Sequence, residues 1–255
     1  MIKKVYKKLV PFRYRIAALN ISKKLYGYLL YGKQVHCVCC GRSFRKFLPK
    51  GNGLVVRPNA ECPNCGSLER GRLLYTYLKN ETSVFAAAPS VLHVSPESFL
   101  RKQFIKNPHY IDVDIDPDLA RYVADITSIP YNDQSFDYVI CSHVLGHIKD
   151  EKKAVDELFR VLKVNGTAFI LTLIDRQADK TLEDDSVVTP RQRLELYGEA
   201  DLERLHALDF IDRLKRQNVI VEVIDYREKF SSRDQQRFSL GDGQRELIYK
   251  CTRLV

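Results

Sequence analysis

The sequence lacks several features that mark special classes of protein. None of its 255 residues falls in a stretch approaching the roughly 18 uninterrupted apolar residues that a membrane-spanning helix needs. Glycine and proline are few, at 12 and 10, and 45% of the residues are apolar, which excludes a collagen, a coiled coil and wholesale disorder. No apolar run or cleavage site follows the N-terminal lysines, so we expect no signal peptide and a cytoplasmic location.

Acidic residues are absent from the first 50 positions, which hold 13 Lys or Arg. The remaining residues carry 28 basic against 32 acidic side chains, so all of the net charge of +9 lies at the front. Apolar residues at helical spacing, such as Ile2, Val5 and Leu9, predict amphipathic helices within residues 1–31. This basic arm could lie on the inner face of an anionic membrane. Alternatively, its charged side could simply be solvated while its apolar side packs on the rest of the protein.

Seven cysteines, an odd number, favour metal binding in a reducing compartment over a disulfide framework. Five of them form two groups, Cys37-Val-Cys39-Cys40-Gly41 and, 21 residues later, Cys62-Pro-Asn-Cys65-Gly66. Two pairs at this spacing predict a structural Zn²⁺ held by Cys37, Cys40, Cys62 and Cys65, with Cys39 as a bystander or a substitute ligand. Four thiolates fill a tetrahedral shell, so this metal has no open position for catalysis.

Strands and helices alternate from Ser90 onward, which predicts an α/β fold with a parallel sheet covered on both faces. We expect strands at 91–94, 110–114, 122–125, 136–141, 167–173, 219–224 and 246–251, and helices at 68–78, 97–106, 151–163 and 207–217. Ser67 is the expected N-cap of the first helix, and residues 174–200 are expected to be a polar, irregular insertion that sets specificity. The chain divides into a basic arm (1–35), a zinc-ribbon-like module (36–72) and an α/β domain (73–255).

Two carboxylates follow neighbouring strands of this predicted sheet. Asp114 ends the second strand, 19 positions after Ser95 in the loop that follows the first, and Asp125 ends the third. At the carboxyl ends of strands, Asp114 could accept hydrogen bonds from two ribose hydroxyls. Asp125 could accept from an adenine amino group, with Ile126 as an apolar wall for the base. Each carboxylate could instead be a helix cap or a turn residue.

Three runs carry a resemblance to a known family. The run from Asp125 to Asp137, His143-Val-Leu-Gly-His147 and Arg160-Val-Leu-Lys163 resemble the class I S-adenosylmethionine-dependent methyltransferases. With the front Cys62-Pro-Asn-Cys-Gly-Ser-Leu-Glu-Arg70, the chain is similar to the type 11-like enzymes encoded among bacterial surface-polysaccharide genes. The resemblance implies a doubly wound, Rossmann-like, seven-stranded sheet with S-adenosylmethionine across its strand ends. The implied cofactor residues are His93, Ser95, Pro96, Glu97, Asp114, Ile115, Asp125, Ile126 and Ser142.

His143 is the candidate catalytic residue. A sulfonium is already an activated methyl donor, so alignment and desolvation contribute most of the acceleration, and an oxygen acceptor also benefits from a general base. His143 follows the fourth strand and titrates near neutrality, although it could instead hydrogen-bond the backbone or cap a helix. Further candidates for substrate binding are Glu183, Asp184, Asp185, Asp201 and Arg204.

Three polar side chains of the family pattern are missing from this sequence. Gly71 and Leu202 stand where the family has histidine, and Gly146 stands where it has glutamate. The favoured function is O-methylation of a sugar or glycan intermediate of surface-polysaccharide synthesis, and the departures raise the alternative of a binding-only relative. An RNA methyltransferase is a further alternative, disfavoured because residues 1–50 lack a base-stacking aromatic motif.

Overall fold

The computed structural model describes residues 25–51, 54–86 and 88–255. Most of the predicted basic arm, residues 1–24, therefore lies outside the described residues. Within the described part of the chain, no helix is long and apolar enough to cross a membrane.

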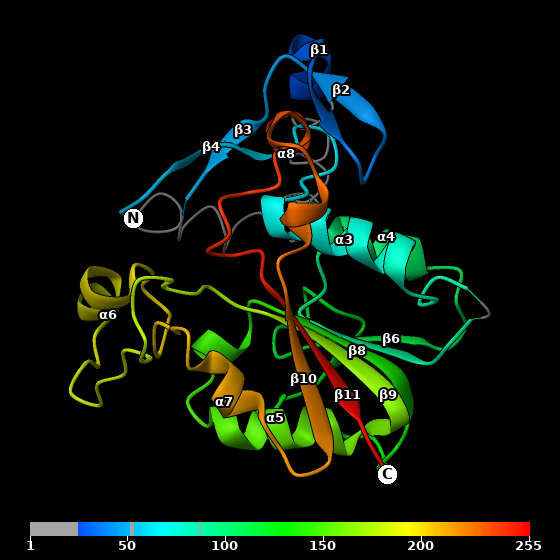
Figure 1. Ribbon diagram of the computed structural model, residues 1–255, viewed down its shortest axis with the longest axis vertical. Helices are drawn as coiled ribbons and strands as arrows, with labels where there is room; N and C mark the ends of the chain where they lie inside the picture. The colour runs from blue at the N-terminus through cyan, green and yellow to red at the C-terminus, as the bar shows by residue number, and fades with distance from the viewer. Residues whose placement is uncertain (1–24, 52–53, 87) are drawn as a thin grey trace.

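A seven-stranded sheet forms the centre of the molecule, in the order β10-β11-β9-β8-β5-β6-β7 (Figure 1). Five strands run parallel: β5 (Val91–Val94), β6 (Tyr110–Asp114), β7 (Tyr122–Val123), β8 (Phe136–Ser142) and β9 (Leu162–Leu171). Strand β11 (Ile248–Arg253) is antiparallel to both of its neighbours, β9 and β10 (Val219–Ile224). The predicted Rossmann-like sheet is confirmed, but the expectation of a wholly parallel sheet is wrong, because alternation along the chain does not fix the direction in which the last strand is inserted.

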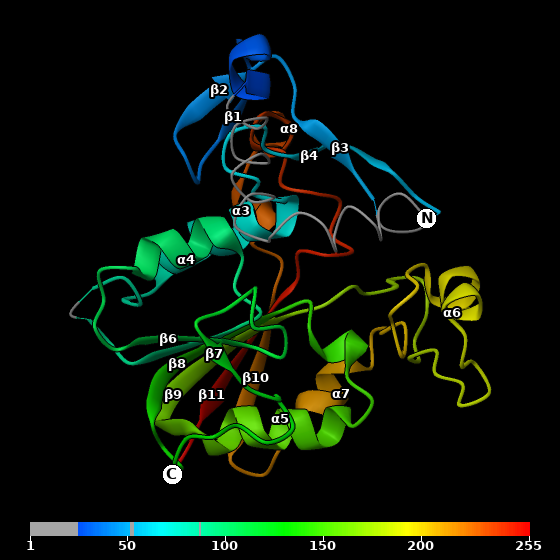
Figure 2. The same cartoon turned by 180° about the vertical axis from the view of Figure 1, so that it is seen from behind.

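Helices cover both faces of the sheet, as Figure 1 and Figure 2 show from opposite sides. On one face lie α3 (Glu69–Glu81) and α4 (Ser98–Phe104), and on the other lie α5 (Glu151–Arg160) and α7 (Phe210–Leu214). The amphipathic pattern of α5 explains its position: Ala154, Val155 and Leu158 are fully buried in the core on that face. Asp150 caps its first turn by accepting a hydrogen bond from the Lys153 N–H.

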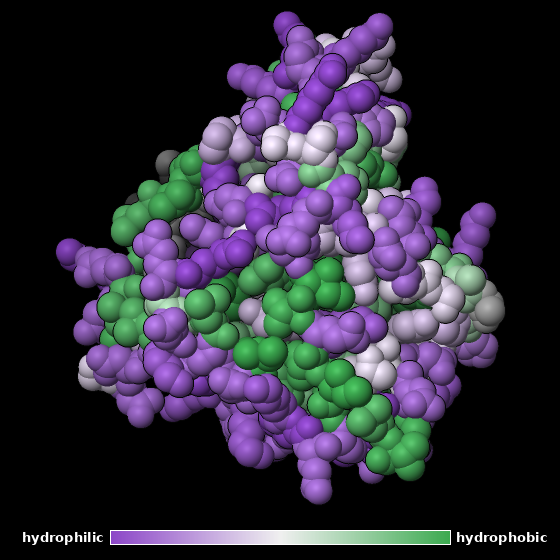
Figure 3. All heavy atoms as spheres, viewed as in Figure 1, coloured by the Kyte–Doolittle hydropathy of each residue, from purple (hydrophilic) through white to green (hydrophobic). Residues whose placement is uncertain are grey.

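The cysteine-rich module lies above the α3 face and contains two short antiparallel pairs of strands (Figure 1). Strand β1 (Tyr31–Cys37) pairs with β2 (Arg42–Phe44), and β3 (Leu48–Lys50) pairs with β4 (Arg57–Glu61). Figure 3, drawn from the same side as Figure 1, shows apolar atoms at the left beside the tip of the second pair, where residues 54–56 are exposed.

The buried guanidinium of Arg72 joins this module to the sheet domain. It donates to the carbonyl oxygens of Ala60 and Ser67 in the module, at 3.0 and 2.6 Å. It also donates to the carbonyl of Ser239 at 2.7 Å, directly after α8 (Ser232–Phe238). Since α3 runs unbroken through Arg72, the predicted boundary between residues 72 and 73 divides a single helix.

Two local expectations are wrong. Leu68, not Ser67, holds the N-cap position of α3, and the Ser67 hydroxyl instead contacts cysteine sulfurs. The insertion 174–200 is not wholly irregular, because it contains α6 (Pro190–Tyr197), which begins with a capping box between Thr189 and Gln192. The contacts of Ser67 depend on how the module folds, whereas Thr189-Pro190-Arg191-Gln192 is a helix-start signal that the sequence carries.

Candidate functional site

Sharp turns follow the carboxyl ends of β5 and β8. Ser95 has a φ of 47° and His143 a φ of 57°, left-handed values that are unusual for residues with a side chain. The Ser95 N–H donates to the Val113 carbonyl at 2.9 Å, and the His143 N–H donates to the Leu171 carbonyl at 2.7 Å, so neighbouring strands hold both turns. Strained turns concentrate at functional sites, and ligands of α/β sheets bind at this edge.

Asp114 is nearly buried at the end of β6, with 7% of its surface exposed. Its Oδ2 accepts a hydrogen bond from the Ser95 hydroxyl at 2.5 Å, and its Oδ1 accepts one from the Asp116 N–H at 2.8 Å. A carboxylate oxygen can accept two hydrogen bonds, so both oxygens retain capacity for a further donor such as a ribose hydroxyl. The spacing of Ser95 and Asp114 in the sequence therefore corresponds to a direct contact between two loops.

Asp125 lies two residues beyond β7. The adjacent Ala124 N–H donates to the Asp114 carbonyl at 3.0 Å, so both carboxylates belong to neighbouring segments at one sheet edge. The Asp125 side chain is exposed, and its Oδ1 accepts from the N–H and the hydroxyl of Thr127, both at 2.8 Å. The bond from the Thr127 N–H, and after it the bond from the Thr127 hydroxyl, lower the pKa of Asp125. Asp125 thus stabilises a turn through Oδ1, and its Oδ2 has no partner among the described contacts.

The apolar residues beside the two carboxylates differ in exposure. Ile126 is 5% exposed and belongs to the buried core on the α5 face, so little of it is open to a ligand. Ile115 is 73% exposed directly after Asp114 and offers an open apolar surface.

Three buried polar atoms without a hydrogen-bond partner surround this edge. They are Arg70 Nε, Glu97 Oε1 and Ser142 Oγ, out of four such atoms in the part of the chain that the structure describes. Opposite charges attract Arg70 to Glu97, but the two side chains form no ion pair among the described contacts. A buried polar atom without a partner costs about 1–3 kcal/mol, so three together indicate a place where a polar ligand supplies the missing bonds.

His93 fixes the position of Glu97. Its Nε2 lies 3.2 Å from Glu97 Oε2, and its Nδ1 lies 3.0 Å from the Tyr110 hydroxyl. Burial favours the neutral carboxyl group of Glu97, but the bond from His93 and the charge of Arg70 lower its pKa overall, so Glu97 is ionised. Pro96, between Ser95 and Glu97, is half-buried in the same loop. His93 is fully buried and supports this loop from the sheet side.

His143 is held as a neutral imidazole. Its Nε2 lies 3.0 Å from the backbone carbonyl of Arg245, and because a carbonyl can only accept, Nε2 carries the proton. Burial lowers the pKa of His143 well below 6.5, and the positive charge of Arg70 lowers it further. The remaining nitrogen, Nδ1, has a lone pair and no partner among the described contacts. His147, four residues on, bonds the Asp201 carbonyl through Nδ1 at 3.0 Å.

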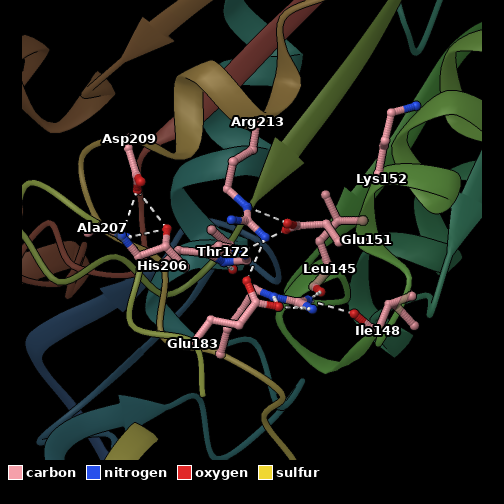
Figure 4. A network of polar contacts seen from close by, with 12 residues as sticks. Leu145, Ile148, Glu151, Lys152, Thr172, Glu183, His206, Ala207, Asp209 and Arg213 are labelled. Carbon is pink, nitrogen blue, oxygen red and sulfur yellow. Dashed lines mark hydrogen bonds and ion pairs between the residues drawn. The ribbon is translucent and has the colours of Figure 1, made fainter. Parts of the chain in front are cut away.

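A polar network holds the loop that follows His143 in place (Figure 4). Arg204 donates to the carbonyl oxygens of Ile148 and Leu145, at 2.6 and 3.2 Å, and pairs with Glu183 at 2.7 Å. Figure 4 also shows Glu151 between His206 and Arg213, each at 2.5 Å. Arg204 is 2% exposed and spends its donors on protein groups, whereas its partner Glu183 keeps 37% of its side chain exposed.

The positions that depart from the family pattern have a steric explanation. A Cβ added to Gly146 would lie 2.9 Å from Leu202 Cδ2. The Leu202 side chain therefore fills the space that a side chain at position 146 would need. A Cβ added to Gly71 would lie 2.5 Å from the ring of Phe99. Side chains of the family type at 71 and 146 would require their neighbours to move.

The structure brings together the four cysteines that the sequence pairs. The ligand atoms of Cys37, Cys40, Cys62 and Cys65 all lie within 4.8 Å of one another, and Cys39 is not part of the group. The sulfurs of Cys37 and Cys65 are 3.6 Å apart, and those of Cys40 and Cys62 are 3.8 Å apart. A tetrahedron with metal–sulfur bonds of about 2.3 Å has edges of about 3.8 Å, so the group has the size that a Zn²⁺ ion requires.

Sequence reasoning assigned no role to Arg70, although it ends the motif that begins at Cys62. Its position in the first turn of α3 is readable from the sequence, but its orientation toward Glu97 depends on how the module packs on the sheet. Arg70 is recognised as a candidate ligand-binding residue because its buried Nε atom has no hydrogen-bond partner among the described residues.

The mixed sheet with its polar carboxyl edge defines a Rossmann-like α/β protein. Residues 91–170 match the family model described as a methyltransferase domain. A solved structure of the [4+2]-cyclase SpnF matches with a TM-score of 0.50 at 14% identity, covering 82% of this chain and 88% of that one. That match supports the fold alone, since one fold hosts several chemistries.

Two curated relatives are methyltransferases. An uncharacterized methyltransferase of Schizosaccharomyces pombe is 27% identical over 132 residues, which cover 47% of this chain and 45% of the relative. The ubiquinone/menaquinone biosynthesis C-methyltransferase UbiE of Xanthomonas campestris is 42% identical over 52 residues, which cover 20% of this chain and 21% of the relative. The chain therefore spans less than half the length of either relative.

Proposed function

We propose that the protein transfers a methyl group from S-adenosylmethionine to a hydroxyl group of a sugar or glycan intermediate. The observation that carries the proposal is the set of three unpartnered buried polar atoms, with Ser142 at the end of β8 and Glu97 shortly after β5, on the sheet edge where Asp114 ends β6. The sugar class of the acceptor rests on the resemblance of the sequence to methyltransferases of surface-polysaccharide synthesis.

The chemistry of these residues fits S-adenosylmethionine. Asp114 has acceptor capacity for the ribose hydroxyls, and Asp125 follows the neighbouring strand with one oxygen open to an adenine amino group. The amino-acid end of the cofactor has an ammonium and a carboxylate, which match the open acceptor of Glu97 and the open donor of Arg70. The cofactor supplies a methyl group already activated on a sulfonium.

The protein's own contribution is to align the acceptor and to remove its proton. His143 stays neutral at physiological pH, and its Nδ1 is available as a general base because Nε2–H is engaged by the Arg245 carbonyl. With a pKa well below 6.5, His143 keeps its lone pair throughout the neutral range. The His206–Glu151–Arg213 cluster and Arg204 keep the base in place by holding the loop beyond it.

The variant His143→Gln tests this assignment, because glutamine can still donate to the Arg245 carbonyl but cannot accept a proton. We expect the turnover number to fall about 10²-fold or more, with the affinity for S-adenosylhomocysteine unchanged. The wild-type rate should stay constant across neutral pH and decline only well below pH 6.5. His147→Gln is the matched control, and an equal loss in both variants would argue against a base at position 143.

RNA is a second candidate acceptor, supported by one feature of the surface. A groove of about 1070 Å³ between β1 and α8 is lined by four basic side chains and by no acidic one. These side chains are Lys33, Arg45, Arg233 and Arg237. If the groove binds RNA, the affinity for a short single strand should fall steeply with salt, and Arg233→Ala should weaken it.

We propose that the cysteine group holds a structural Zn²⁺. The sulfur spacing fits, and backbone N–H groups of Gly41 and Gly66 close the turns that carry the cysteines, at 2.8 and 2.9 Å from the carbonyls of Cys37 and Cys62. Four thiolates leave the ion no open position, so it would stabilise the module that places Arg70.

We also propose peripheral contact with an anionic membrane through residues 1–31. In the part of this arm that is described, Leu25, Tyr28 and Leu29 are more than half exposed. Their replacement by serine should reduce sedimentation with anionic liposomes, and retention of full binding would argue against the contact.

A further inference from the structure

A cleft of about 280 Å³ opens beside His143, between the cysteine-rich module and the sheet edge. We call it the basic cleft, because its lining includes four basic side chains, Lys50, Arg57, Arg70 and Arg245. The acidic side chains in its lining are Glu199 and Asp201. Cations therefore outnumber anions. Two histidines also line the cleft, His143 and His147, and burial keeps His143 neutral.

Four separate segments deliver the cations to this one space. Lys50 ends β3, Arg57 begins β4, Arg70 lies in the first turn of α3, and Arg245 precedes β11. The β3–β4 pair projects on the same side of the molecule as α6 in both views of the ribbon (Figure 1 and Figure 2). No single helix or strand face would group these charges, so the fold itself assembles them.

Existing ion pairs do not use up these cations. Arg245 donates through Nη1 to Glu199 at 3.1 Å, and Arg57 pairs with Glu69 at 2.9 Å. A guanidinium has five N–H donors, so both arginines keep donors for a ligand. Lys50 lies 3.2 Å from Glu61 and keeps 42% of its side chain exposed, so its ammonium can also turn to an anion.

A second cavity, of about 350 Å³, adjoins the basic cleft and shares Arg57, Glu199 and Arg245 with it. Its lining is partly apolar: Leu54, Val55, Leu194, Leu196, Tyr197 and Leu205. Figure 3 shows apolar atoms beside the β3–β4 pair, where Leu54 and Val55 are 73% and 72% exposed. The same lining also carries four carboxylates, Asp175, Glu195, Glu199 and Asp242. The cationic cleft thus continues into a cavity with an apolar part and an acidic part, and the apolar part suits a chain without charge.

We propose that the methyl acceptor is an amphiphile with a phosphoryl group, held in the basic cleft by Lys50, Arg57 and Arg245, whose apolar part lies in the adjoining cavity. This inference rests on the proposed function. A carboxylate is matched by one guanidinium, whereas a phosphoryl group offers enough oxygens for several cations around it. Binding there places the acceptor beside Nδ1 of His143, while Arg70 faces the cofactor loop.

Titration calorimetry with three phosphoryl probes tests the proposal, on protein already saturated with S-adenosylhomocysteine. The probes are inorganic pyrophosphate, uridine diphosphate and geranyl diphosphate. We expect all three to bind and geranyl diphosphate to bind about tenfold more tightly than pyrophosphate, because only its chain enters the apolar cavity. Tighter binding of uridine diphosphate than of geranyl diphosphate would overturn the apolar part and assign the phosphoryl group to a nucleotide.

Lys50→Ala and Arg245→Gln should each weaken pyrophosphate binding about 3- to 10-fold, whereas Val55→Ser should weaken only geranyl diphosphate. Lys152→Ala is the matched charge control, since Lys152 lies on α5 and is 82% exposed. No binding of any probe, or binding that Lys50→Ala and Arg245→Gln leave unchanged, would overturn the proposal. The initial saturation with S-adenosylhomocysteine reports on the cofactor site separately, so failure of the cleft and failure of the proposed function are distinguishable.

Discussion

Replacing Asp114 by asparagine is the sharpest test of the cofactor site. Asparagine keeps one acceptor oxygen for the Asp116 N–H, and its amide N–H₂ can donate to the Ser95 hydroxyl, so both loop contacts survive. What is lost is one charge-assisted hydrogen bond to a ribose hydroxyl. Such a bond contributes about 1.5–3 kcal/mol, so the affinity for S-adenosylhomocysteine should fall about 10- to 150-fold.

Isothermal titration of the wild type and the variant measures this loss directly. Asp116→Asn, which removes the same charge two residues away, is the matched control and should bind normally. An analogue of S-adenosylhomocysteine without the ribose hydroxyls should lose affinity for the wild type but little for Asp114→Asn. Equal affinity of the wild type and Asp114→Asn for the full ligand would refute the role of Asp114 at the ribose.

Three further outcomes are expected. Metal analysis should find about one zinc per chain, and Cys40→Ser should lose it; a metal-free wild type with four freely titrating thiols would contradict the zinc site. Burial raises the pKa of Glu246 to about 7 from 4.5, so its contribution to stability is present below pH 4.5 and is lost as the pH rises through 7. The free energy of unfolding of the wild type, measured with urea, should therefore fall by about 3 kcal/mol over this pH range relative to that of Glu246→Gln. If the two proteins show the same pH dependence, the raised pKa of Glu246 is excluded. Gly146→Glu should lower the free energy of unfolding by about 1–3 kcal/mol through overpacking against Leu202, and adding Leu202→His should recover part of this loss.

The sequence predicts most of the sheet because apolar runs and strand ends are local signals. The limits of β5, β6 and β10 agree with the expected strands, and Asp114 falls at the end of its strand as expected. The direction of β11 escaped prediction because it depends on where a connection crosses the sheet. The helix inside the insertion was overlooked although its start, Thr189-Pro190-Arg191-Gln192, is a local signal.

The candidate site divides in the same way. The grouping of the four cysteines follows from their spacing and is present in the structure, whereas the hydrogen bond from Ser95 to Asp114 was not predicted. The neutral tautomer of His143 depends on a carbonyl 102 residues away, and the open donor of Arg70 depends on the packing of the module. Contacts of this range leave no periodic mark in a sequence, so only the folded chain shows them.

Titration of the unmodified protein with S-adenosylhomocysteine tests the central claim most directly. If the carboxyl edge of the sheet is a cofactor site, one molecule should bind per chain, saturably, and compete with S-adenosylmethionine. Absence of binding by correctly folded protein would contradict the methyltransferase function.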